Sequence, residues 1–72
     1  MSFYAMINDR AKANYSGPEL TRENYEEVWF PAWFGAAQNI HDEFVAEGLT
    51  VTAAAVKVII DENKKLSGYE GV

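Results

Sequence analysis

His41 is the residue of this 72-residue chain whose chemistry is easiest to put to use, because it stands beside Asp42 and Glu43. A histidine next to acids is typical of a general base or a metal site. On a helix, however, adjacent residues point in different directions, and a shared face belongs to positions three and four residues away. Those positions hold Ala37, Gln38, Phe44 and Val45. Since none of them is a carboxylate or a second histidine, we predict that His41 is a surface or boundary residue.

Nucleophilic catalysis has equally little support. The chain contains no cysteine, and its three serines stand at positions 2, 16 and 67, so no triad of nucleophile, base and orienting group can be proposed with any specificity. The lack of cysteine also excludes disulfides and a thiolate zinc site. We therefore expect no enzymatic activity, no catalytic residue, no cofactor and no metal ion.

The charge pattern favours binding to another macromolecule. Eleven acidic residues against six basic ones leave a net charge of -5, which repels nucleic-acid phosphates and anionic lipid and suits a basic partner surface. The acids of the middle of the chain are Glu23, Glu26, Glu27, Asp42, Glu43 and Glu47. They form either a solvated helix exterior or, in a sharper alternative, a negative surface that imitates nucleic acid in the basic groove of a DNA-handling protein.

Residues 29–34 are the densest apolar feature, with both tryptophans and two of the four phenylalanines. On a helix, Trp29 and Trp33 share one face, and Phe30 and Phe34 repeat the pair about 100° further round. The resulting band is wider than a single core contact usually needs. Large apolar residues are also frequent elsewhere in the chain. This surplus predicts partner binding or self-association as a homodimer.

Within this band, the spacing separates a core residue from candidate binding residues. Trp33 continues a stripe formed by Ala36, Ile40 and Phe44, so it is predicted to lie in the core. Phe30 and Phe34 lie off the stripe and are predicted to bind a partner. The acids predicted to form the rim of this surface are Glu23, Glu26 and Glu27.

The elements that must position these residues are helices. Apolar side chains recur every four residues from Phe3 to Tyr15, behind a Ser2 cap, which predicts a helix over 3–14. After a Ser-Gly-Pro break, Thr21 is a candidate cap for a second helix over 22–30. Leu20 and Tyr25 flank that cap at the spacing of a hydrophobic staple.

Pro31 divides the second half of the aromatic band from the first. Proline lacks a backbone N–H and its ring clashes with the carbonyl one turn earlier, so we predict a kink or a restart of the helix at this residue. Apolar periodicity then predicts a helix over 32–47. Gly48 is expected in the left-handed conformation after it, with Leu49 folding back toward Phe44.

A last helix is predicted over 51–66, starting at Thr50 or Thr52 and ending before Gly68, with residues 68–72 as a tail. The residues expected on its buried face are Ala55, Val56, Ile59, Ile60 and Leu66. Asp61 and Lys65 are expected to pair on its exposed face. The β-branched residues between 49 and 60 would also suit a buried strand, but the three alanines at 53–55 and the polar run that follows favour a helix.

Residues 45–60 resemble the helix-turn-helix of lac-repressor-type regulators. That family has Val-Ala in its first helix, an apolar-small-apolar turn, a Ser or Thr cap, and further apolar positions in the recognition helix. The residues that match, without a gap, are Val45, Ala46, Leu49, Thr50, Val51, Thr52, Val56, Ile59 and Ile60. The resemblance covers 16 of 72 residues. It implies a DNA-binding regulator in which Ala53, Ala54 and Lys57 take the exposed recognition positions.

Together these patterns predict a single small all-α domain over residues 1–72 with three or four helices. No apolar run approaches the roughly 20 residues of a membrane span, and residues 1–4 lack the features of a signal peptide, so a cytoplasmic protein is expected. The leading hypothesis is an acidic protein-binding regulator or inhibitor, such as a phage or mobile-element anti-defence protein. Its partner would be a basic nucleic-acid-handling protein rather than DNA itself. The alternatives are the helix-turn-helix regulator and a structural oligomer subunit.

Overall fold

The computed structural model describes residues 2–68, which form three α-helices and one π-helical turn without any β-strand. Helix α1 spans Phe3–Asn14 and the π-helical turn η1 spans Tyr25–Trp29. Helices α2 and α3 span Phe30–Ala46 and Thr50–Ser67. The predicted small all-α fold is thus confirmed. The tail expected after Gly68 lies outside the described residues.

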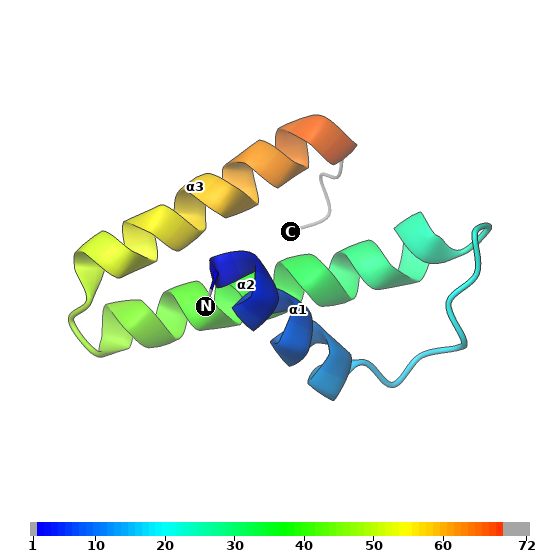
Figure 1. The fold of residues 1–72 in the computed structure, drawn as a ribbon, viewed down its shortest axis with the longest axis horizontal. Helices are drawn as coiled ribbons and strands as arrows, with labels where there is room; N and C mark the ends of the chain where they lie inside the picture. Colours follow the sequence, from blue (N-terminus) through cyan, green and yellow to red (C-terminus); the bar gives the residue numbers. More distant parts are fainter. Residues whose placement is uncertain (1, 69–72) are drawn as a thin grey trace.

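Helix α2 is the central element, because α1 and α3 both pack against it. In Figure 1, α3 returns alongside α2 in the opposite direction, α1 crosses the same central helix, and residues 15–24 form a long loop between α1 and η1. The largest fully buried side chains come from all three helices and are Ile7, Ile40, Val56 and Ile60. None of the helices in residues 2–68 has the length and apolar character needed to cross a membrane.

Helix α1 forms where its sequence predicts it. The Ser2 hydroxyl accepts a hydrogen bond from the Ala5 N–H at 3.1 Å, which satisfies one of the amides left unpaired at a helix start. Ile7 and Ala11 are completely buried and carry the apolar stripe into the core. The predicted bounds of 3–14 are confirmed.

The second predicted helix, over 22–30, is wrong in extent. Residues 22–24 form a turn, and only the five residues of η1 precede α2. The Thr21 hydroxyl accepts from the Asn24 N–H at 3.2 Å, while the Asn24 Oδ1 accepts from the Thr21 N–H at 2.7 Å. This reciprocal pair has the pattern of a capping box, so the predicted Thr21 cap forms, but the residues after it make a turn and then a π-helical turn instead of an α-helix. Leu20 and Tyr25, expected as a staple, are both exposed.

At Pro31, where a kink or a restart was predicted, the helix changes its winding from π to α, with α2 beginning at Phe30 and Pro31 in its first turn. The backbone stays helical through Trp29 and Phe30, so η1 passes into α2 without a break. A proline needs no N–H partner in the first turn of a helix, and its ring requires space near the carbonyl four residues earlier. The wider winding of the π-helical turn is an expected response to both requirements.

The corner between α2 and α3 has the predicted glycine cap. Gly48 has a φ of +79°, and its N–H donates to the Val45 carbonyl at 3.0 Å. The Leu49 N–H donates to the Phe44 carbonyl at 2.9 Å, which completes a Schellman motif. Helix α3 then begins at Thr50 and ends before Gly68, whose φ is +73°.

The turn implied by the helix-turn-helix resemblance does not form where the motif places it. The motif puts an apolar turn at 49–51 and a cap at Thr52, whereas in the structure Thr50 and Thr52 both belong to α3. Val51, expected inside the turn, is 85% exposed. The glycine cap at Gly48 turns the chain earlier, and α3 then lies alongside α2 (Figure 1).

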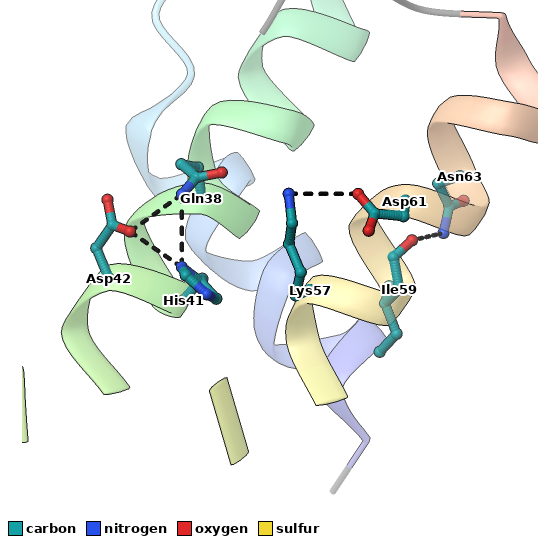
Figure 2. A network of polar contacts seen from close by, with 7 residues as sticks. All are labelled: Gln38, His41, Asp42, Lys57, Ile59, Asp61 and Asn63. Atoms are coloured by element: carbon teal, nitrogen blue, oxygen red, sulfur yellow. Dashed lines mark hydrogen bonds and ion pairs between the residues drawn. The ribbon is translucent and has the colours of Figure 1, made fainter. Parts of the chain in front are cut away.

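Helix α3 buries a narrower stripe than predicted. Val56 and Ile60 are buried and Ile59 is half-buried, as expected, and Ala53 joins them. Ala55 and Leu66 are exposed, Leu66 at 86%, because α3 contacts α2 along one side only. The ion pair predicted between Asp61 and Lys65 is also wrong. Asp61 pairs with Lys57 at 3.4 Å instead (Figure 2).

Candidate functional site

Side chains from α1, η1, α2 and α3 converge on a pocket of about 200 Å³, which we call the aromatic pocket. Its lining consists of Tyr4, Asn8, Tyr25, Trp29, Phe30, Trp33, Phe34, Asn63 and Ser67. Six of these nine residues are aromatic, and none is charged. A concave site with many rings and a few polar groups is typical of a binding site.

The rings of the pocket pack against one another. The centroids of Trp33 and Phe34 are 5.1 Å apart with an edge-to-face interplanar angle of 81°, and those of Tyr25 and Phe30 are 5.7 Å apart at 78°. Tyr4 lies 6.2 Å from Trp33 at a tilt of 34°. Such ring pairs each contribute roughly 0.5–1.5 kcal/mol beyond their burial. The pocket wall is therefore held in place by its own aromatic contacts.

Two asparagines and Ser67 supply the polar part of the lining, and the asparagines hold other lining side chains by hydrogen bonds. The Trp33 Nε1–H donates to Asn8 Oδ1 at 2.7 Å. The Asn63 Nδ2 group donates to the Tyr4 hydroxyl at 2.9 Å and to the Ile59 carbonyl at 2.8 Å, and the second of these bonds is drawn in Figure 2. Both N–H bonds of the Asn63 amide are thus used within the fold. Its Oδ1 has no donor among residues 2–68.

An acidic segment, residues 19–27, borders the aromatic pocket. It carries four glutamates against one arginine, a net charge of -3, and all four glutamates are exposed. Tyr25 joins the two features, because it lines the aromatic pocket and also a shallow surface groove formed by residues 20–23, 25 and 26. Glu23 and Glu26 line this groove.

The predicted binding residues are only partly brought together. Glu23, Glu26 and Glu27 are exposed, and Phe30 is half-buried in the pocket lining. Phe34, also predicted to bind a partner, is only 3% exposed and belongs to the core as well as to the pocket lining. Helices α1 and α3 both pack against α2, so the buried part of α2 extends beyond one stripe. Trp33 is 8% exposed, which confirms its predicted place in the core.

Sequence reasoning missed the residues that α1 and α3 contribute to the pocket. Tyr4 and Asn8 are four residues apart on α1, as are Asn63 and Ser67 on α3, so each pair shares a helix face. This four-residue spacing is the sequence feature that could have indicated a shared polar and aromatic face on each helix. The meeting of Tyr4 with Asn63, 59 positions apart, depends on how α1 and α3 pack on α2.

Known proteins add no family to this geometry. No family model, curated protein or solved structure matches the chain. The possible chemistry therefore follows from the site itself, which offers ring faces for stacking and amide oxygens for accepting hydrogen bonds.

The His41 cluster is a separate polar network on α2, shown in Figure 2. Asp42 Oδ1 accepts from Gln38 Nε2 at 3.0 Å and lies 3.0 Å from His41 Nδ1. The prediction that Asp42 points away from His41 is wrong, because its side chain folds back toward the ring. Hydrogen bonding to His41, and then to Gln38, lowers the pKa of Asp42. Residues 2–68 contain no group of three His, Cys, Asp or Glu side chains that could hold a metal ion.

Proposed function

We propose that this protein is a small acidic protein-binding regulator or inhibitor that inserts one large side chain of its partner into the aromatic pocket. The acidic segment 19–27 contacts basic residues of the partner beside the insertion point. The observation that carries this proposal is the pocket itself, a site lined by six aromatic residues and continuous with an acidic surface.

The size of the pocket supports a side chain as its occupant. Sites for small molecules and cofactors usually enclose about 300–1,000 Å³. A pocket of about 200 Å³ lies below that range and suits a single amino-acid side chain. Anchoring by one side chain in a well-packed pocket is the usual arrangement of an interface hot spot.

The rim of the pocket has the composition of a binding surface. Tyr4 is 45% exposed, Tyr25 is 43% exposed, and Leu20 in the adjoining groove is 36% exposed. Tyrosine is enriched at hot spots because it combines a large apolar surface with a polar end. These side chains would become covered when a partner binds.

The net charge indicates the kind of partner. A chain with a charge of -5 and a local charge of -3 beside its pocket attracts basic proteins and accelerates their association. We propose that the target is a basic nucleic-acid-handling protein of the cytoplasm. The glutamates of the acidic segment would then occupy the positions that nucleic-acid phosphates take on that protein. The phage or mobile-element origin belongs to the same hypothesis.

An affinity pulldown with a matched set of variants tests the proposal. Tyr25→Ala removes an exposed ring from the pocket rim, and Glu23→Gln with Glu26→Gln removes two charges from the groove. Each change should reduce capture of the partner about tenfold or more. The control variant, Glu47→Gln with Glu62→Gln, makes the same charge change on exposed residues outside both sites and should capture normally. Unchanged capture by the Tyr25 and Glu23 variants would refute the proposal.

A homodimer is the second candidate, favoured by the outer side of α3. Val51 and Val58 share a helix face and are 85% and 55% exposed. Two such faces can bury each other in a symmetric contact. Sedimentation at micromolar concentration should then show a dimer that Val51→Lys with Val58→Lys dissociates. A monomer in both cases would remove this candidate.

A further inference from the structure

We infer that the partner side chain received by the aromatic pocket is an arginine, stacked on the rings and hydrogen-bonded to amide oxygens of the lining. This inference rests on the proposed function and specifies the chemistry of the partner. It follows from the charge, the ring faces and the hydrogen-bond acceptors of the pocket.

The electrostatics of the lining disfavour an acidic occupant. No lining residue among residues 2–68 carries a positive charge, so a carboxylate would enter without a counter-ion, at a high desolvation cost. Aromatic faces are the negative part of the ring quadrupole and attract cations. The neighbouring acidic segment adds to the same negative potential.

The ring geometry distinguishes a guanidinium from an ammonium group. Tyr25 and Phe30 meet at 78° and Tyr4 lies tilted against Trp33, which gives the pocket ring surfaces in several orientations. A guanidinium is planar and weakly hydrated, so it stacks on such faces at low desolvation cost. The ammonium of lysine is strongly hydrated, and the lining residues that the structure describes include no carboxylate to replace its water.

The lining also contains hydrogen-bond acceptors for a guanidinium. Asn63 Oδ1 has no donor among residues 2–68. Asn8 Oδ1 accepts from the Trp33 indole and retains a second lone pair. A guanidinium presents five N–H donors in a flat fork, whereas an apolar side chain would offer Asn63 Oδ1 no donor and would displace its water.

Short peptides of sequence Lys-Gly-Xaa-Gly-Lys test the inference, with Xaa as arginine, citrulline, lysine, leucine or tryptophan. Citrulline has the shape of arginine without its charge. Both tryptophans of the chain line the pocket, so their fluorescence reports occupancy by the four peptides without tryptophan, and the Trp33 indole N–H reports it by NMR for all five. The arginine peptide should bind most tightly, about tenfold better than the citrulline peptide.

Variants of Tyr25 test whether the preference for the arginine peptide over the citrulline peptide arises in the aromatic pocket. Tyr25→Leu keeps an apolar side chain but removes the ring face, and should bring the arginine and citrulline peptides to within about twofold of each other. Tyr25→Phe keeps the ring and should retain the preference. Far-UV circular dichroism verifies that both variants fold, as expected for a side chain that is 43% exposed.

The possible failures separate the inference from the proposed function. Tightest binding of the leucine or tryptophan peptide would overturn arginine as the occupant and leave a protein-binding pocket in place. Equal affinity for arginine and citrulline would overturn it as well. No response to any peptide at millimolar concentration would also overturn it, while the proposed function is judged independently by capture of the folded partner with the Tyr25→Ala variant.

Discussion

Phe34 illustrates, at the scale of single residues, how neighbouring helices decide whether a side chain is core or surface. Phe30 lies four residues before Phe34, so the two side chains share one face of α2. The centroids of the two rings are 6.3 Å apart, yet Phe34 is buried and Phe30 is only half-buried. The difference comes from which part of α2 lies under α1 and α3.

Substitution of the two phenylalanines should separate their roles. Phe34→Ala should lower the free energy of unfolding by about 3–5 kcal/mol, because it leaves a cavity in a fully packed position. Phe30→Ala should cost clearly less, since part of its ring already faces solvent. Urea denaturation followed by circular dichroism measures both values. Equal losses would contradict the structure.

The hydrogen bond between Trp33 and Asn8 allows a second test on single side chains. Asn8→Ala removes the acceptor of the Trp33 indole N–H and should cost about 1 kcal/mol of stability. The indole N–H signal should move in the NMR spectrum and exchange faster with solvent. Asn14→Ala, at the exposed end of the same helix, is a control that should leave this signal unchanged.

At the scale of elements, the helix ends and the π-helical turn have local causes. Ser2, Pro31 and Gly48 each act through one backbone property, namely a hydroxyl acceptor, a missing N–H and an accessible positive φ. The α2–α3 corner depends on the positive φ of Gly48. Its geometry determines the direction in which α3 returns along α2.

Two glycine substitutions should have opposite effects on stability. Gly48→Ala forces a side chain into the left-handed region and should cost about 1–2 kcal/mol, although the added methyl would meet no atom within 4 Å. Gly35→Ala also meets no atom within 4 Å, but it lies inside α2 with a negative φ and should gain about 0.5–1 kcal/mol. Thermal denaturation compares the two variants. A loss of stability from Gly35→Ala would contradict the helical packing described.

At the scale of the whole molecule, α1 is joined to α2 by an exposed ion pair as well as by the core. The Arg10 guanidinium donates to both oxygens of Glu43, at 2.7 and 3.0 Å. Hydrogen bonding from Arg10 lowers the pKa of Glu43, and Arg10 has its own pKa raised by the same contact. The pair is solvent-exposed, so its contribution is modest and depends on pH and salt.

This ion pair predicts how stability depends on acidity. A carboxylate whose pKa is lower in the folded state stabilises the fold above its unfolded pKa, and that contribution is lost as the pH falls through the folded value. The melting temperature should therefore drop below about pH 5, and Glu43→Gln should make the drop shallower. Glu47→Gln, at a position without an ion pair among residues 2–68, should keep the steeper drop. Identical profiles for the two variants would refute the prediction.

The sequence by itself determined the features that depend on neighbours along the chain. The Ser2 cap, the bounds of α1, the change of helix winding beside Pro31 and the glycine cap at Gly48 are all set within a few residues, where backbone hydrogen bonds and allowed φ values decide the outcome. The all-α class followed from the same local patterns. The turn at 22–24 and the π-helical winding of η1 were not foreseen, because the Thr21 cap fits the start of an ordinary α-helix equally well.

Only the tertiary structure decided the candidate site. Packing of α1 and α3 on α2 buries Phe34, leaves Leu66 exposed and brings Tyr4 to Asn63 across 59 positions. Helical periodicity shows which residues of one helix share a face, but it does not show which helix will cover that face. The aromatic pocket exists because four elements contribute to it at once, so it could not be predicted from any one of them.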